Sequence, residues 1–531
     1  MFTDRKILRF LFLIPVILAY LTVLMSHQHV DPDAKIILTN LYGAGDVFGY
    51  IKNLLSFKTV DFQPMRDLTL SFDIWTFYKL GINTFIAQNL FWWLASLIVF
   101  SRIIRFNFQR LSDLTLYMII SLLGTYPLFS NVISWGMNRK HLLALFFITL
   151  ATDCLLRSRR SFIIVICYLL STLSQPIHIL WPLWACGYLS YRKELWDNKK
   201  LIITLGISLI TIAALNTLYY SHSETYKFFY TDKTADLWNI PDKTLAMGHY
   251  LFQLIAPYFL SFKYDLSHWS VLTGVVLIPL LVYLCYKEKN RKELLIWIAG
   301  GMLPLLVVLN DPHVISDAYL LYPAFMFLMF LLHILSNHEF RISRNWLFVP
   351  LILWTALTAH NSSLWNNRLD LAGSGFRTRP SCESVMNYLK VGYDLYERDP
   401  VALKFAEENN CFNNMTVTSS FYFSLVVLFS HYYFHEETLP LDFRIERLKK
   451  LSERHLYAHL SLIGLLINEK QLELARSEVE RLEKTWGKIP VETEYHEITV
   501  RFVRPFCERE NLSGCLLITE KLIRKPDRPN L

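Results

Sequence analysis

Two acids near the N-terminus are candidates for a proton-transfer step. The segment His29-Val30-Asp31-Pro32-Asp33 follows directly after a long apolar run. A carboxylate at the aqueous edge of a membrane can take the proton of an attacking hydroxyl, or it can orient a second group. Acids that follow an apolar helix also commonly do no more than mark the water interface. Asp33 is the first candidate for a general base, with Asp31 beside it as the second.

Three cations are candidates for holding a phosphate. Arg66 lies in the segment 63–69, and Arg139 and Lys140 lie in the segment 135–141. A planar guanidinium binds phosphate oxygens through two parallel hydrogen bonds. An arginine that reaches toward lipid headgroups is an equally good explanation of Arg66. Arg139 and Lys140 run against the charge pattern of their side of the membrane, which favours a function for them.

Four further polar residues occur at the ends of apolar segments, in positions that suit supporting roles. They are His141, His178 in the turn Ser174-Gln175-Pro176-Ile177-His178, and Asp317 and Tyr319 at the start of a later apolar run. A histidine at a membrane boundary is often a hydrogen-bonded structural residue. An acid at a helix N-terminus also interacts favourably with the helix dipole, which is the structural explanation of Asp317.

The elements that must position these residues are membrane helices. The chain has 531 residues, of which 53% are hydrophobic and 18% charged, and its mean hydropathy is +0.29. This composition is too apolar for a water-soluble globular protein. Because about 20 apolar residues cross a bilayer as a helix, we expect eleven spans. They lie near 7–25, 83–101, 113–132, 140–156, 161–174, 177–191, 201–219, 270–286, 294–309, 318–335 and 346–361.

Loop charge predicts the orientation of these spans. One set of loops carries 19 Lys and Arg residues, and the short loops of the other side carry two. By the positive-inside rule the N-terminus is cytoplasmic, and the long loops 26–82 and 220–269 lie outside. The net charge of +8 comes mostly from these topological residues, so nucleic-acid binding is not expected. We therefore expect an all-α polytopic membrane protein, with a membrane domain at 1–365 and an exported helical domain at 366–531.

The exported domain has features of its own. Its four cysteines, Cys382, Cys411, Cys507 and Cys515, are an even number in an oxidising compartment, which predicts disulfides. Three pairings are open, and proximity in sequence favours 382 with 411 and 507 with 515. From Tyr457 onward the spacing of small and apolar residues approaches a 34-residue tetratricopeptide unit, followed by a poorer second unit. A short helical cap that binds no ligand explains this tail as well.

In their order along the chain, the motifs resemble those of a known family. They are Asp33-x-x-Ile-Ile-Leu-x-Asn40, Arg66-x-Leu-Thr69, Asn89, Trp135-x-x-x-Arg139, Ser174 and Asp317-x-Tyr-Leu-x-x-Pro323. This order resembles the transmembrane and tetratricopeptide-repeat O-mannosyltransferases and their bacterial relatives. These enzymes belong to the GT-C class of glycosyltransferases that use polyprenyl-phosphate sugars. The resemblance covers about residues 1–375 and extends more loosely into the tail.

The resemblance implies a GT-C-like bundle of about 11 transmembrane helices that transfers a sugar from a polyprenyl-phosphate donor. The acceptor would be a protein Ser/Thr hydroxyl or a glycan on the outer face. Asp33 or Asp31 would act as base, and Arg66, Arg139 and Lys140 would hold the donor phosphate. The displacement would invert the anomeric carbon. A divalent metal is compatible with this scheme but is not implied by it, and the remaining partner is the lipid bilayer. The expected location is the bacterial inner membrane with a periplasmic C-terminal domain, or the endoplasmic reticulum with a luminal one.

The chain also departs from the family pattern. The first of the relatives' two adjacent acids aligns with Pro32, and Asp67 follows Arg66 where relatives have proline. Gln175-Pro176 and Ala318 stand where a Lys-Glu pair and an arginine are usual. Two alternatives therefore stay open. One is a catalytically divergent membrane scaffold that binds partners through its tail. The other is a polyprenol-linked glycan ligase or polymerase, although such enzymes carry a large late outer loop and the late loops here are short.

Overall fold

The structure is a computed structural model, and the residues it describes are entirely α-helical or irregular, as predicted. They are residues 13–25, 47–56, 59, 62–80, 82, 84–157, 160–222, 240–255, 268–288, 291–308, 317–337, 344–378, 382–394, 399–409, 411, 429–430, 432–434, 439–453, 456–486, 503–510, 512, 515–516 and 519. The chain forms two compact units, Met1–Ser384 and Val385–Leu531. The sequence placed this boundary at 365/366. It lies later because helix α20 (Arg368–Thr378) packs on the short helix η5 (Leu364–Asn366) of the first unit.

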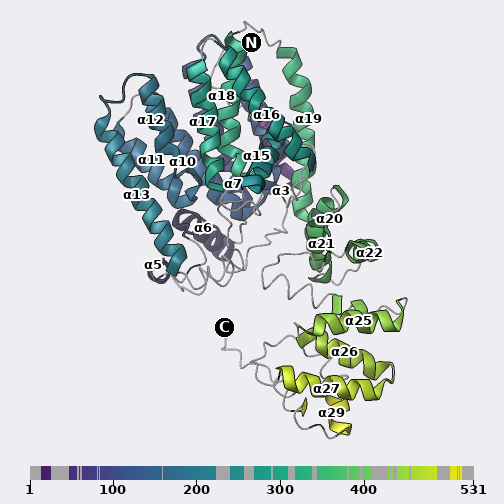
Figure 1. Cartoon of the computed structure of the whole chain (residues 1–531). Coiled ribbons are helices and arrows are strands. Elements are labelled where there is room, and N and C mark those ends of the chain that lie inside the picture. Colours follow the sequence, from purple (N-terminus) through teal and green to yellow (C-terminus); the bar gives the residue numbers. More distant parts are fainter. Residues whose placement is uncertain are drawn as a thin grey trace. The chain divides into compact units, whose positions relative to one another are not determined.

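The N-terminal unit contains most of the helices (Figure 1). Besides α20 and η5 they are α2 (Ile14–Ala19), α3 (Leu21–Leu24), α5 (Val47–Leu55), α6 (Pro64–Leu80), α7 (Phe85–Asn107), α8 (Asp113–Gly124), η1 (Pro127–Phe129), α9 (Ser130–Ser134), η2 (Gly136–Asn138), α10 (Arg139–Leu156), α11 (Ser161–Ser174), η3 (Pro176–His178), α12 (Trp181–Tyr191), α13 (Lys199–His222), α15 (Ile240–Ile255), α16 (His268–Lys287), α17 (Arg291–Val308), η4 (Asp317–Leu320), α18 (Leu321–Asn337) and α19 (Arg344–Ser363). Helix α21 (Cys382–Asp394) begins at the end of this unit.

A helix stands at each of the eleven predicted span positions. Among the described residues, four helical segments are long and apolar enough to cross a membrane: Phe85–Asn107, Lys199–His222, Asp317–Ser336 and Leu347–Asn366. A fifth is possible if the bent pair Asp113–Gly124 and Pro127–Ser134 forms one span. Several other helices are short for a crossing; α11 has 14 residues and α12 has 11. The number of eleven spans stays a prediction.

The bend between α8 and α9 amounts to 44° and has a local cause. Pro127 begins η1 and has no backbone N–H to continue the helix. Neighbouring helices take up the backbone groups that this break leaves without intrahelical partners. The indole Nε1 of Trp93 donates to the Gly124 carbonyl at 3.2 Å, and the Thr358 hydroxyl donates to the Thr125 carbonyl at 2.8 Å. Within a membrane such partners are what make a broken helix tolerable.

Helix α10 is central to the bundle, because it packs against α7, α11, α18 and α6. At its C-terminal end the fully buried Asp153 pairs with Arg102 of α7 at 2.6 Å and with Arg157 at 2.7 Å. The Arg157 guanidinium also donates to the Arg102 carbonyl at 2.9 Å. The end of α10 is thus tied to the end of α7 by charge-assisted hydrogen bonds.

The two long predicted loops contain helices of their own. Helices α5 and α6 lie within residues 26–82, and α15 lies within residues 220–269. The segment 63–69, expected to be part of a loop, instead begins α6. Proline at the first helical position explains this start, since its missing N–H would have no intrahelical partner there. Figure 1 shows α6 at one end of α10 and α11, the two helices on which it packs.

The C-terminal unit contains α22 (Pro400–Glu408), α25 (Leu441–Ser452), α26 (Leu456–Asn468), α27 (Leu472–Trp486) and α29 (Arg504–Arg509). Helix α26 packs against both α25 and α27. Ala475 and Leu482, two residues of the expected repeat pattern, are fully buried on α27. A helix pair therefore exists where the first tetratricopeptide-like unit was predicted, while much of the second lies outside the described residues.

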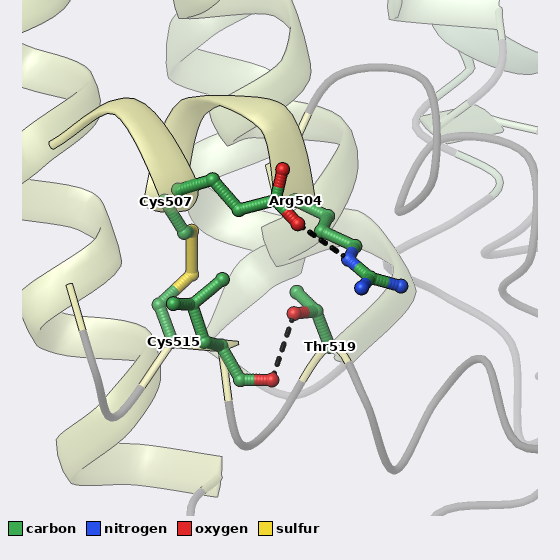
Figure 2. The surroundings of a disulfide bond; sticks show 6 residues. Arg504, Cys507, Cys515 and Thr519 are labelled. Atoms are coloured by element: carbon green, nitrogen blue, oxygen red, sulfur yellow. Dashed lines mark hydrogen bonds and ion pairs between the residues drawn. A yellow bond between two sulfur atoms is a disulfide. The ribbon is translucent and has the colours of Figure 1, made fainter. Parts of the chain in front are cut away.

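A disulfide joins Cys507 of α29 to Cys515 (Figure 2). On the same helix Arg504 pairs with Glu508 at 2.8 Å. Cys382 and Cys411 are also disulfide-bonded. The free thiols are the four cysteines of the apolar helices, Cys154, Cys167, Cys186 and Cys285. Disulfide formation by all four cysteines of the predicted exported region confirms the expectation drawn from their even number.

Candidate functional site

The first part of the candidate site is an arginine at the start of α6 whose charge is balanced by a neighbouring aspartate. Arg66 is 1% exposed and binds Asp67 through two nitrogens, Nε at 2.7 Å and Nη2 at 2.6 Å. Its Nη1 donates to Gln63 Oε1 at 2.7 Å, and Gln63 in turn donates to Gln175 Oε1 at 2.8 Å. The Tyr50 hydroxyl donates to the other oxygen of Asp67 at 2.7 Å. This network joins α5 and α6 to the turn after α11.

The second part is a buried ion pair between α10 and α6. Arg139 was expected in an external turn, but it forms the first turn of α10 after the short helix η2. A cation there is disfavoured by the helix dipole. The carboxylate of Asp73 offsets this cost by accepting from Arg139 Nη1. The guanidinium also donates to the carbonyls of Phe85, at 2.6 Å, and Thr69, at 3.4 Å.

Asp73 is held by more than its arginine. Its Oδ1 accepts from the Thr84 hydroxyl at 2.5 Å and from Gln88 Nε2 at 2.7 Å. Burial raises the pKa of Asp73, and the charge of Arg139 and the hydrogen bond from Thr84 act against that rise. Because Asp73 belongs to α6 and its carboxylate makes hydrogen bonds with residues of α7 and α10, it is a junction between three helices.

Asn89, a motif residue of α7, completes this junction. Its Oδ1 accepts from Arg139 Nε at 3.0 Å, while its Nδ2 donates to the carbonyls of Ile133 at 3.0 Å and Trp135 at 2.9 Å. Those carbonyls belong to the break between α9 and α10, where no regular helical partner exists. Asn89 therefore orients Arg139 and satisfies the broken backbone with a single amide.

The third part is a group of rings on α10, η3, η4 and the start of α18. The His141 ring contacts Tyr319 edge to face, with centroids 5.2 Å apart, and His178 contacts Tyr322 in the same way at 5.1 Å. Ser171 hydrogen-bonds His178 Nδ1 at 3.0 Å. His178 and Arg66 both lie near His141. The rings and the α6 arginine therefore belong to one region of the unit.

Two buried polar atoms in this region lack hydrogen-bond partners. His141 Nδ1 and the Ser134 hydroxyl have none in the part of the chain that the structure describes. Both residues are buried, and α9 and α10, on which they stand, meet at this end of the bundle. Since buried polar groups in native proteins nearly always have partners, these two atoms make this end of the bundle a candidate site.

The structure places the predicted site residues as follows. Arg66, Arg139, His141, His178 and Tyr319 gather at one end of α10, with Lys140 half-buried beside them. Asp317 is buried and begins η4, as its expected N-terminal position required. Asp31 and Asp33 lie outside the described residues. No three His, Cys, Asp or Glu side chains are grouped as metal ligands within the described ranges.

The sequence analysis missed Asp73. The signal that could have found it is a single acid in an otherwise apolar stretch, Phe72-Asp73-Ile74-Trp75. An ionisable residue in such a setting is by default a candidate for pairing or function. Its partner Arg139 lies 66 residues away in sequence, which no local pattern reveals.

The chain was compared with known proteins at the level of family models, curated sequences and solved structures, and none of these comparisons finds a match.

Proposed function

We propose that this chain is a membrane glycosyltransferase of the GT-C class, with a GT-C-like bundle of about 11 transmembrane helices. It transfers a sugar from a polyprenyl-phosphate donor to a hydroxyl of a protein or glycan. The observation that supports this proposal is spatial. Residues of motifs far apart in sequence, Arg66, Arg139, His141, His178 and Tyr319, meet at one end of α10.

In the proposed reaction the acceptor oxygen attacks the anomeric carbon as the bond from that carbon to the phosphate oxygen breaks. The acceptor proton passes to Asp33, or to Asp31 if Pro32 has moved the role. Polyprenyl phosphate leaves with the bonding electron pair, so the anomeric configuration inverts. A phosphate is a good leaving group, and the scheme therefore requires no general acid.

The contacts that each cation makes in the structure guide which of them we propose as ligands of the donor phosphate. Arg139 is fully buried, and its guanidinium binds Asp73, Asn89 and two carbonyls. We assign it to positioning α6. The proposed phosphate ligands are therefore Lys140 and Arg66. Lys140 directly follows Arg139 and is half-buried, and Arg66 lies near His141. A phosphate at Arg66 must share the guanidinium with Asp67 or displace that acid.

The direct test uses the full chain reconstituted in vesicles with a series of polyprenyl-phosphate sugars. We expect one donor to be consumed, with equal amounts of free polyprenyl phosphate and glycosylated acceptor formed. Mass spectrometry of polyprenyl phosphates that copurify with native lipid identifies the donor beforehand. Donor hydrolysis without an acceptor product would not support the proposed transfer.

The scaffold alternative has one observation in its favour. Both arginines of the site are buried and paired with acids of α6, Arg66 with Asp67 and Arg139 with Asp73. A protein that had lost its substrate would need such pairs solely for its fold. If the reconstituted chain neither binds nor consumes any polyprenyl-phosphate sugar, the scaffold becomes the better conclusion.

A further inference from the structure

Helix α6 buries charged side chains and exposes large apolar ones. Its buried side carries charge, including Arg66 and Asp73, which are 1% and 0% exposed. Its outward side carries Leu68, Phe72 and Trp75, which are 43%, 54% and 53% exposed. A helix on the surface of a water-soluble protein has the opposite arrangement, with its apolar stripe toward the core. The outward face of α6 is therefore unsuited to water.

The outward residues form one continuous stripe. Leu68, Phe72 and Trp75 follow one another at four and three residues, the spacing that places side chains on one face of a helix. The rings of Phe72 and Trp75 stack with their centroids 6.0 Å apart. Lys79 is exposed one turn further on. Tryptophan followed by a lysine that can reach outward is typical of helices at a membrane interface.

Beside this stripe, a groove of about 430 Å³ separates α6 from α7. Its lining is mostly apolar and consists of Leu68, Thr69, Phe72, Gln88, Phe91 and Trp92. The α7 wall belongs to the candidate span Phe85–Asn107. On that span Phe91 is 59% exposed, and Ile98, two turns further on, is 47% exposed. The groove is thus continuous with the exposed apolar face of a helix that is long enough to cross a bilayer.

The polar base of the groove belongs to the Arg139–Asp73 network. The Thr69 carbonyl accepts from Arg139, and Gln88 Nε2 donates to Asp73 at 2.7 Å. These contacts hold α6 against α7 at the base of the groove. They also leave the apolar side chains of both helices directed outward, toward the surroundings of the bundle.

We propose that the outward face of α6 lies in membrane hydrocarbon and that one lipid chain occupies the groove between α6 and α7. Continuity with the exposed face of α7 identifies this occupant, because the same apolar surface extends from Ile98 through Phe91 to Phe72. The inference is independent of glycosyl transfer. It requires only that α7 crosses the membrane beside α6.

Accessibility of spin labels tests the placement of α6. Single cysteines replace Leu68, Phe72 or Trp75 in the full chain, in a background in which the four free thiols are changed to alanine. The labelled protein is reconstituted in vesicles of phosphatidylethanolamine and phosphatidylglycerol. Ile207→Cys on the exposed, apolar α13 is the lipid control, and Leu474→Cys on α27 of the C-terminal unit is the aqueous control.

The measurement is relaxation of each label by oxygen, which concentrates in hydrocarbon, and by a water-soluble nickel chelate. We expect the ratio of oxygen to nickel relaxation at all three α6 positions to match Ile207→Cys and to exceed Leu474→Cys several-fold. A ratio equal to that of Leu474→Cys overturns the proposal. Immobilised labels that neither reagent reaches also overturn it, because protein rather than lipid then covers this face.

Photolabelling tests the groove itself. Phosphatidylcholine with a diazirine near the middle of one acyl chain is irradiated with the reconstituted protein, and labelled residues are mapped by mass spectrometry. We expect residues 88–92 to be labelled several-fold more than the exposed face of α13. Leu68→Trp, which fills the groove, should remove this excess, whereas Leu183→Trp on the exposed side of α12 should not. If residues 88–92 are labelled no more strongly than α13, the proposal that a lipid chain occupies the groove is overturned.

Discussion

Arg139 and Asp73 form an ion pair from which solvent is completely excluded, joining the first turn of α10 to the middle of α6. Each partner is further bound by residues of α7, Asn89 and Phe85 for the arginine and Thr84 and Gln88 for the acid. Three helices are therefore held in register by charge-assisted hydrogen bonds. A network of this kind stabilises a bundle only while both charges are present, because either one alone is buried without compensation.

Removing one partner of this pair should destabilise the N-terminal unit strongly. Asp73→Ala leaves the Arg139 charge buried, and the expected loss is about 3–5 kcal/mol. Asp73→Leu combined with Arg139→Met should cost much less than the sum of the two single changes. Thermal unfolding in detergent, followed by fluorescence-detected size exclusion, measures each variant. Glu194→Ala is the control, because its pair with Arg192 is partly exposed to solvent, and it should change stability by less than about 1 kcal/mol.

Strictly additive losses for Asp73 and Arg139 would contradict the proposed coupling. The reason is that a thermodynamic cycle assigns interaction energy only to the non-additive part. Arg139→Lys should not restore stability, since one ammonium cannot reach Asp73, Asn89 and the Phe85 carbonyl from the directions that the guanidinium occupies.

Gly300 permits close packing of α17 against α12, and a methyl group there should be harmful. A Cβ at this position would lie 2.7 Å from the indole Nε1 of Trp184. That nitrogen is held by a hydrogen bond to the Ile296 carbonyl at 2.9 Å, so it cannot move without cost. We expect Gly300→Ala to destabilise the chain by about 1–3 kcal/mol, the usual cost of overpacking.

The chain supplies a matched control for this change. Among the described residues, none lies within 4 Å of a Cβ added at Gly206 on α13. Gly206→Ala should therefore be neutral or stabilising by up to about 1 kcal/mol, because alanine favours the helix more than glycine does. Equal melting temperatures for the two alanine variants would show that the contact with Trp184 does not limit the packing.

The helices of the bundle could be predicted because long apolar runs are local features of the sequence. A described helix lies within each of the eleven runs of the membrane domain. The polar motifs of the sequence named Arg66, His141 and His178 as candidate site residues, and the role of each stays a prediction. Helix α6 was missed because Arg66, Asp67 and Asp73 interrupt its apolar residues. Nothing in such a pattern distinguishes a surface loop from a helix whose charged side is buried.

The ion pairs of the site could not be predicted, for a different physical reason. Whether an arginine is available to a ligand depends on its distance from acids elsewhere in the chain, and Asp73 meets Arg139 only after α6 packs on α10. The sequence therefore indicated Arg139 only as a candidate site residue. It offered Arg139 as a phosphate ligand because it had no means of recognising its acidic partner.

The C-terminal unit should lose stability in acid through Glu478. This carboxylate hydrogen-bonds His459 at 3.1 Å and pairs with Arg481 at 2.8 Å. Burial opposes its ionisation, but the hydrogen bond with His459 and the charges of Arg481 and Lys449 outweigh burial and lower its pKa from the ordinary value of 4.5. A lowered pKa means that the folded state favours the charged form. The stabilisation is therefore present above pH 4.5 and is lost as the pH falls through the lowered value.

Hydrogen exchange of the α26 and α27 amides in the full chain measures this effect. Protection of these amides from exchange in the wild-type protein should fall as the pH decreases from 4.5 through the lowered pKa of Glu478. Glu478→Gln should reduce protection already at neutral pH and remove this part of the pH dependence. Glu480→Gln changes an exposed acid two residues further on, so its exchange should follow the wild type. If protection in Glu478→Gln falls with pH as it does in the wild type, carboxylates other than Glu478 cause the loss of stability in acid.

The last prediction tests catalysis and separates the base from the phosphate ligands. If Asp33 takes the acceptor proton, Asp33→Asn keeps its shape but cannot accept the proton, so sugar transfer should fall about 10²–10⁴-fold. Donor binding should change little. Asp31→Asn should have a smaller effect unless Pro32 has passed the role to it. Intact turnover in folded Asp31→Asn, Asp33→Asn and the double variant would exclude both acids as the base.

Lys140→Ala and Arg66→Ala should instead weaken donor binding, because each removes a charge-assisted contact to phosphate, and Arg66→Lys should rescue only partly. The measurements are transfer from the polyprenyl-phosphate sugar in vesicles and, separately, donor retention. Because Arg66→Ala also leaves the buried Asp67 without this partner, it should lower thermal stability as well. Arg139→Ala differs from Lys140→Ala in its expected result. It should lower thermal stability and activity together, since its guanidinium holds α6 through Asp73 rather than touching the donor. If an Arg139 variant melts like the wild type but no longer retains the donor, Arg139 would be a phosphate ligand after all.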